Sequence, residues 1–181
     1  MKNAIILHGT YDRPDMYWFP YIKGKLEEKG YEVWLPQLPE VKPNLDDWLP
    51  FVLDNGQYSD ETILIGHSAG AQLILSILEN LDVCFKQAVM VSGYSKLLRA
   101  TVEIEKNEVE PDWDKIKGKA KQFVFINSDN DPWECDDSQG RIMLDHLGGI
   151  QVIPKGEGHM GSNYFNQPYK EHRLLAKLLD F

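Results

Sequence analysis

Cysteine is nearly absent from this chain of 181 residues, which has only Cys84 and Cys135. Two cysteines that nothing marks as a pair do not make the framework of a disulfide-rich secreted domain. The apolar run near the amino terminus, residues 4–7, is too short for the hydrophobic part of a signal peptide. We therefore expect reduced thiols and a cytoplasmic protein.

Long hydrophobic runs and an excess of positive charge are also missing. No apolar stretch approaches the roughly 20 residues that a membrane-spanning helix needs. The 28 acidic residues outnumber the 19 basic ones and leave a formal net charge of −9, which argues against nucleic acid or a membrane as the partner. The length and the 43 % of apolar residues suit one domain, residues 1–181, with a substantial core.

Apolar, β-branched runs alternate with helical patterns along the whole chain. The runs predict strands at residues 4–7, 31–35, 63–65, 87–93, 122–127 and 150–153. Helices are expected at residues 21–29, 45–53, 71–81, 137–147 and 168–181. Such alternation predicts an α/β fold, a three-layer α/β/α sandwich with six parallel strands in the order 2-1-3-4-5-6.

Residues 94–117 interrupt this alternation with many charges and with Pro111. Two short helices are expected within them, at residues 95–99 and 113–116. The segment follows the fourth predicted strand, where a small cap over a site and a plain surface excursion would both fit.

The pentapeptide Gly66-His67-Ser68-Ala69-Gly70 joins the third predicted strand to the helix after it. In this context Gly-x-Ser-x-Gly is the pattern of a nucleophile elbow, whose glycines allow the tight turn that presents the serine. The backbone N–H of Ala69 is then expected to face the same space and to stabilise an oxyanion. The alternative is an ordinary serine in a tight turn.

A serine nucleophile needs a base, and the base needs an orienting acid. Asp131-Pro132 follows the fifth predicted strand, and Gly158-His159 follows the sixth. Both loops open at the carboxyl edge of a parallel sheet, so Ser68, Asp131 and His159 are expected to meet there, in the chain order of α/β-hydrolases. Asp129 competes for the orienting role, and we favour Asp131 because the Asp-Pro pair restrains the loop.

The loop after the first strand, residues 8–11, adjoins the nucleophile strand and is expected to supply a second oxyanion donor, the amide of Thr10. Aromatic residues in and near this loop favour a substrate pocket or a partner surface. Substrate contacts are expected from four side chains, Tyr11, Trp18, His67 and Trp133. Of the other histidines, we expect His8 to pack near the elbow, and His146 and His172 to be solvated.

Two further patterns suggest cofactors that the rest of the chain does not support. Residues 156–161 match Gly-x-Gly-x-x-Gly, but no βαβ unit follows them. Residues 129–131 begin like a calcium loop, but Trp133 and Glu134 stand where a ligand and a glycine are required. Cys135 does not lie in a nucleophile-elbow pattern like the one around Ser68. No metal, no cofactor and no thiol nucleophile is therefore expected.

Taken together, these motifs resemble the small serine hydrolases related to retinoblastoma-binding protein nine, over nearly the whole chain. The matching elements are His8-Gly9, Trp18-Phe19-Pro20, the elbow at residues 66–70, Asp131-Pro132 and Gly158-His159. The resemblance implies a compact α/β-hydrolase fold, a triad of Ser68, Asp131 and His159, and a carboxylesterase-like activity.

The sequence thus predicts a metal-free serine hydrolase with a small-molecule ester as its substrate, or less readily a thioester or an amide. The reaction would pass through an acyl-enzyme. Two alternatives remain open: a hydrolase-shaped binding protein with little catalysis, and an acyltransferase that uses the same triad.

Overall fold

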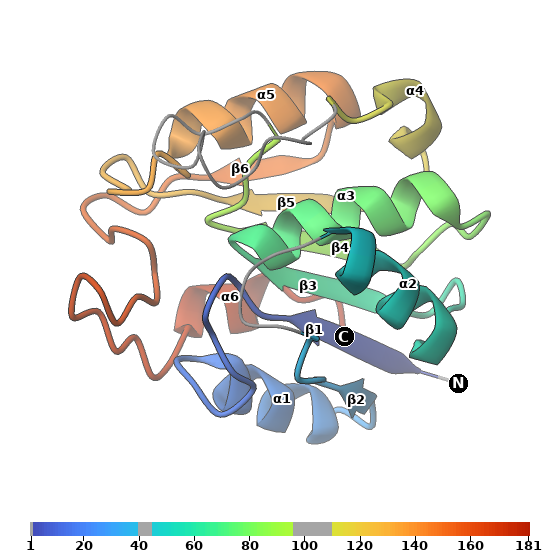
Figure 1. Ribbon diagram of the computed structural model, residues 1–181, viewed down its shortest axis with the longest axis horizontal. Coiled ribbons are helices and arrows are strands. Elements are labelled where there is room, and N and C mark those ends of the chain that lie inside the picture. Colours follow the sequence, from blue (N-terminus) through green and yellow to red (C-terminus); the bar gives the residue numbers. More distant parts are fainter. Residues whose placement is uncertain (1, 40–44, 96–109) are drawn as a thin grey trace.

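The computed structural model describes residues 2–39, 45–95 and 110–181 (Figure 1). Its centre is a parallel sheet of six strands in the order β2-β1-β3-β4-β5-β6, which confirms the expected topology. The strands are β1 (Asn3–Leu7), β2 (Glu32–Trp34), β3 (Ile63–His67), β4 (Gln87–Val91), β5 (Phe123–Ile126) and β6 (Ile150–Val152). The four inner strands are buried throughout, whereas the edge strands β2 and β6 are partly exposed.

Helices cover both faces of the sheet and make three layers (Figure 1). One face carries α1 (Phe19–Glu27) and α6 (Arg173–Leu178). The other face carries α2 (Leu45–Asn55), α3 (Ala69–Asn80), α4 (Trp113–Ile116) and α5 (Asp137–Leu147). Each face has its own apolar core because successive side chains of a strand point to opposite sides.

The helix boundaries mostly follow the sequence pattern. Helix α5 occupies the predicted residues, and α2 contains Pro50 as expected. Helix α1 begins at Phe19, earlier than predicted, because the following Pro20 is tolerated in a first helical turn. Among the described residues, no helix is both long enough and apolar enough to cross a bilayer.

The last helix is much shorter than predicted. Helix α6 spans only Arg173–Leu178 instead of residues 168–181. The preceding residues form a loop instead, in which Ser162 and Gln167 pair as an antiparallel bridge and Tyr169 has a φ of 36°, outside the helical region. Leu175 is still fully buried in the core on that face of the sheet.

The interrupted segment after β4 is described only in part. The predicted short helix at residues 113–116 is present as α4. The predicted helix at residues 95–99 and most of the expected cap lie outside the described residues.

The strands share one direction, so their carboxyl ends lie along one edge of the sheet, at the left of Figure 1. The loop after β1, the turn after β3 and the long loops after β5 and β6 start from this edge. These are the segments that hold Thr10, Ser68, Asp131 and His159.

Candidate active site

Ser68 occupies a strained turn between β3 and α3. Its backbone has φ 54° and ψ −121°, a region that residues other than glycine rarely adopt. The flanking glycines are needed because backbone packs against both of them: a Cβ on Gly66 would lie 2.5 Å from the carbonyl oxygen of Gly70. A Cβ on Gly70 would collide with the carbonyl oxygens of Leu7 and His8. The turn therefore presents a half-buried serine at the amino terminus of α3.

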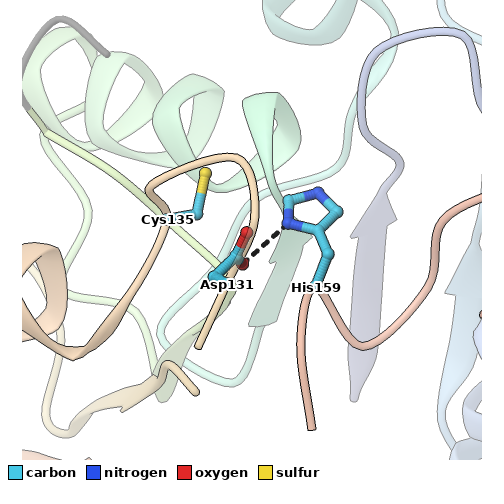
Figure 2. A group of neighbouring side chains, drawn as sticks. All are labelled: Asp131, Cys135 and His159. Carbon is cyan, nitrogen blue, oxygen red and sulfur yellow. Dashed lines mark hydrogen bonds and ion pairs between the residues drawn. The ribbon is translucent and has the colours of Figure 1, made fainter. Parts of the chain in front are cut away.

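His159 and Asp131 form a buried hydrogen-bonded pair at the same edge of the sheet (Figure 2). His159 Nδ1 lies 2.8 Å from Asp131 Oδ2, and the two side chains are 7 % and 0 % exposed. The other carboxylate oxygen, Asp131 Oδ1, accepts a hydrogen bond from the Trp133 amide at 2.9 Å. Because the carboxylate accepts the proton on Nδ1, the Nε2 atom of a neutral ring is left as the hydrogen-bond acceptor.

Asp129, the competing carboxylate, has a different partner. Its Oδ1 accepts a hydrogen bond from the Gly156 amide at 2.7 Å, and the residue is exposed. Of the two acids in the loop after β5, the structure thus brings Asp131, and not Asp129, to the imidazole of His159.

Further hydrogen bonds connect the loop after β5 to the loop after β6. Asn130 Oδ1 accepts from the Gly158 amide at 2.8 Å. The hydroxyl of Ser128 donates to the Pro154 carbonyl at 2.9 Å and accepts from the Glu157 amide at 3.0 Å. Together these bonds set the position of each loop against the other, close to the Asp131–His159 pair.

Hydrogen bonds hold the backbone of His159 at both its amide and its carbonyl oxygen. Its amide donates to Gln167 Oε1 at 3.0 Å. Its carbonyl oxygen accepts two hydrogen bonds of 2.9 Å, from Ser92 Oγ and from His67 Nε2. Burial lowers the pKa of His159 below its usual value of 6.5, and the hydrogen bond to Asp131 opposes that shift. The ring is consequently neutral at neutral pH, as a general base must be.

Two backbone amides flank Ser68. Ala69 is the first residue of α3, and the first amides of a helix have no intrahelical acceptor. On the other side, a Cβ on Gly9 would lie 3.0 Å from Ser68 Cβ, so the turn that contains Thr10 begins against the serine. Within the described chain, the Thr10 amide has no backbone acceptor. The expectation that both amides bind an anionic oxygen beside Ser68 therefore stays a prediction.

The four side chains expected to contact a substrate differ in accessibility. Tyr11 is 53 % exposed, and Trp133 is half-buried. Trp18 and His67 are 0 % exposed, so neither offers surface to a ligand, and the expectation is wrong for these two residues. The Trp18 ring packs in the core under α1, and its Nε1 donates to the Met160 carbonyl at 2.9 Å.

Three aromatic residues, of which only Trp133 was predicted to line the site, form a cluster beside the loop of Asp131. Trp133 packs against Tyr164 and Phe165, with ring centroids 5.4 and 5.2 Å apart. Tyr164 is 79 % exposed and Phe165 is 38 % exposed. The sequence did contain a signal for this cluster, because Tyr164 and Phe165 are adjacent aromatic residues in an otherwise polar loop. Because Trp133 also donates its amide to Asp131, the cluster offers an apolar surface next to the pair.

The remaining histidines lie at different depths. His146 is exposed and stacks on Trp113, with centroids 4.5 Å apart, and His8 is buried near the elbow, as predicted for both. His172 is 1 % exposed, which overturns the expectation that it is solvated. Its side chain caps α6 by accepting from the Leu175 amide, and burial lowers its pKa to about 4.

Three side chains of the site could hold a metal ion by type and distance. Asp131, Cys135 and His159 are all buried, and they offer one ligand atom each within 4.8 Å of one another (Figure 2). Asp131 and His159 are already bonded to each other, so an ion bound there would replace their hydrogen bond. Cys135 was not expected to act as a nucleophile, and its sequence position did not indicate that its thiol lies within 4.8 Å of the ligand atoms of the pair.

Comparison with known proteins adds independent information. Residues 4–176 match the model of a family described as serine hydrolase. The chain is 30 % identical over 135 residues to the putative hydrolase YdeN of Bacillus subtilis, which covers 72 % of this chain and 71 % of YdeN. It is 26 % identical over 120 residues to the serine hydrolase RBBP9 of Rattus norvegicus, which covers 64 % of this chain and 63 % of RBBP9.

Solved structures show the same fold. The crystal structure of the ydeN gene product from B. subtilis matches with a TM-score of 0.88 at 24 % identity, over 98 % of this chain and 96 % of that one. Est1E from Butyrivibrio proteoclasticus, with ferulic acid bound, matches with a TM-score of 0.72 at 14 % identity, over 98 % and 86 % of the two chains.

Proposed function

Because this chain belongs to the serine hydrolase family and is therefore an enzyme, we propose that it cleaves carboxylic esters by nucleophilic attack of Ser68. Thioesters and amides are less favoured substrates. The observation that carries the proposal is the buried 2.8 Å hydrogen bond between His159 and Asp131. It supplies an oriented base at the sheet edge where the strained turn presents the serine.

In the proposed first half-reaction, Ser68 Oγ attacks the ester carbonyl carbon and His159 Nε2 takes the hydroxyl proton. The carbonyl oxygen becomes an oxyanion, which the amides of Ala69 and Thr10 bind. The bond to the alcohol then breaks, and His159 gives its proton to the leaving oxygen. Asp131 accepts the Nδ1–H hydrogen bond throughout and stabilises the imidazolium. The product at this stage is an acyl-enzyme on Ser68.

In the second half-reaction, water replaces the alcohol. His159 takes a proton from the water, whose oxygen attacks the acyl carbon. Collapse of the tetrahedral intermediate breaks the bond to Ser68 Oγ, and the serine regains its proton from His159. The acid is released and the enzyme returns to its starting state.

The surroundings of the site favour an apolar acyl or aryl group. The aromatic cluster of Trp133, Tyr164 and Phe165, together with exposed Tyr11, offers apolar surface near the Asp131 loop. Est1E, which has the same fold, binds ferulic acid. Hydroxycinnamate esters therefore belong in the substrate panel beside short-chain and long-chain alkyl esters.

Covalent labelling tests the nucleophile without knowledge of the substrate. A fluorophosphonate probe should modify Ser68, as mapped by mass spectrometry, and the labelling rate should fall by about a thousand-fold or more in Ser68→Ala and His159→Ala. Asp131→Asn should also lose most of the rate. The matched control Asp129→Asn should stay within about threefold of wild type, because within the described residues Asp129 accepts from the Gly156 amide in the neighbouring loop and does not contact His159.

Two outcomes would overturn the proposal. One is modification of a residue other than Ser68, and the other is no labelling of a folded wild-type protein, which would favour the binding-protein alternative. With an active enzyme, an ester panel run with added alcohols would separate hydrolysis from acyl transfer by the products formed.

A further inference from the structure

A second carboxylate–imidazole pair, a partly buried Asp12 and a fully buried His67, lies beside His159. His67, the last residue of β3, is 0 % exposed, and its ring centroid lies 4.8 Å from that of His159. Its Nδ1 lies 3.4 Å from Asp12 Oδ2, in the loop after β1. The same carboxylate oxygen accepts a hydrogen bond from the Gly9 amide at 3.2 Å. The mechanism proposed above uses neither His67 nor Asp12.

The other nitrogen of His67 is bonded to the proposed base. His67 Nε2 lies 2.9 Å from the carbonyl oxygen of His159, and a carbonyl can only accept, so Nε2 carries a proton. Ser92 Oγ donates to the same oxygen, also at 2.9 Å. The main chain of His159 is therefore held from the ends of two central strands, β3 and β4.

The Nδ1 atom of His67 lies beside the Asp12 carboxylate but makes no hydrogen bond within the described chain. An ionised carboxylate is also only an acceptor, so a lone pair on Nδ1 would face the lone pairs of Asp12 at 3.4 Å. A proton on Nδ1 would instead face an acceptor, and the imidazolium so formed would be balanced by the Asp12 carboxylate. The edges of Tyr17, Trp18 and Phe19 surround the ring, and an unpaired charge would be very costly in that setting.

We propose that Asp12 and His67 are a positioning pair that holds the base His159 and the oxyanion loop in one fixed relation. Asp12 anchors the Gly9 amide, one residue before Thr10, and His67 anchors the carbonyl of His159. Ser68 follows His67 directly in the chain, so the pair contacts the serine turn, the base and the loop of the second oxyanion donor. This inference rests on the proposed roles of Ser68 and His159.

The pair also acts electrostatically on the base. A positive charge on His67 lowers the pKa of His159, and Asp12 raises it by less. The other titratable groups that face the two rings are Asp131, His8, Tyr17 and His172. Burial keeps the latter three neutral near pH 7, since it lowers the pKa of both histidines and raises that of Tyr17 to about 12. Removal of both charges of the pair should thus raise the pKa of His159.

The charge state can be tested without any substrate. In nitrogen-15 NMR of the wild-type protein at pH 7, both ring nitrogens of His67 should be protonated. In Asp12→Asn, whose amide can donate to Nδ1, only Nε2 should carry a proton. A neutral His67 ring in the wild type would overturn the inference, whether or not the protein hydrolyses esters.

Kinetics test the positioning role. His67→Gln can still donate to the carbonyl of His159 and should lose less than about tenfold in kcat on p-nitrophenyl acetate, whereas His67→Leu should lose about a hundredfold, with KM little changed in both. In Asp12→Asn and His67→Gln, the acid limb of kcat/KM should move to higher pH by about 0.5 to 1 unit. A purely structural role would lower the melting temperature and leave that limb in place.

A matched control comes from the same loop. Asp15→Asn removes the same charge from a side chain that is 74 % exposed and bonded to Arg13, so its pH profile should equal that of the wild type. An unmoved acid limb in Asp12→Asn, or equal losses in His67→Gln and His67→Leu, would overturn the positioning role. Absence of turnover and of fluorophosphonate labelling in the wild type would instead reject the proposed function. The NMR measurement would still report the charge of the His67 ring, because it needs no substrate.

Discussion

Asn130 Oδ1 accepts a hydrogen bond from the Gly158 amide at 2.8 Å, across 28 residues of sequence. Asp131 follows Asn130, and His159 follows Gly158. This one bond therefore joins the two loops immediately before the carboxylate and the imidazole. The hydroxyl oxygen of Ser128 lies 2.7 Å from the same oxygen, which is a second acceptor within reach of its proton. The distance between Asp131 and His159 therefore depends on a neighbour that takes no part in the proposed chemistry.

The first prediction concerns this connection. Asn130→Ala removes the acceptor and should lower the fluorophosphonate labelling rate by about ten- to a hundredfold, since small displacements of catalytic groups are costly. Asn130→Asp keeps an acceptor oxygen and should recover most of the rate. Equal rates in wild type and Asn130→Ala would show that other contacts suffice to hold the two loops.

The second prediction concerns pH and activity. Burial lowers the pKa of His159, and the ring must be neutral to accept the serine proton. The labelling rate of Ser68 should thus fall at acidic pH, with a midpoint below 6.5, as the ring becomes protonated. A profile whose midpoint lies above pH 6.5 would contradict this assignment of the base.

The third prediction concerns pH and stability. In the unfolded chain His172 binds a proton below about pH 6.5, whereas in the folded protein it does so only near its lowered pKa of about 4. The unfolded state then binds more protons, so the free energy of unfolding should fall by about 3 kcal/mol as pH decreases from 6.5 to 4.

Two variants isolate the contribution of His172. His172→Asn can still cap α6 by accepting from the Leu175 amide, but it does not titrate, so its stability should depend less on pH. His146→Asn, which changes an exposed histidine, should keep the slope of the wild type. Urea unfolding at several pH values measures all three proteins, and identical slopes in wild type and His172→Asn would refute the assignment.

The fourth prediction concerns the serine turn. Gly70→Ala places a Cβ against the carbonyl oxygens of Leu7 and His8 and should destabilise the protein by about 3 kcal/mol or more. The control is Gly24→Ala in α1, where a Cβ meets nothing within 4 Å. That change should stabilise the protein by about 0.5 to 1 kcal/mol, because alanine favours helix. Equal free energies of unfolding for the two variants would contradict the packing described for the turn.

The fifth prediction concerns divalent metal ions. Thiolate, imidazole and carboxylate are all ligands of Zn²⁺, and Asp131, Cys135 and His159 present one of each. Zn²⁺ should therefore slow labelling of Ser68 by occupying the base, and a chelator should restore the rate. Cys135→Ala should weaken this inhibition by about tenfold or more, whereas Cys84→Ala, which alters an exposed thiol, should not. Equal inhibition of both variants would place the ion elsewhere.

The sequence by itself determined the order of the elements and the nature of the serine turn. Buried parallel strands appear as continuous apolar runs, and the turn around Ser68 requires glycines at fixed positions. Both signals are local, because each depends on residues within one strand, one helix or one turn. For the same reason the family could be identified from the sequence: its motifs lie in short segments such as residues 66–70.

Only the tertiary structure decided which side chains meet. Asp131 rather than Asp129 faces His159 because Asp129 is held by the Gly156 amide in another loop. His172 and Trp18 are buried because the loop before α6 folds back onto the core instead of extending the helix. The pairing of Asp12 with His67 likewise joins the loop after β1 to the end of β3. Contacts of this kind depend on packing between distant segments, which no local periodicity encodes.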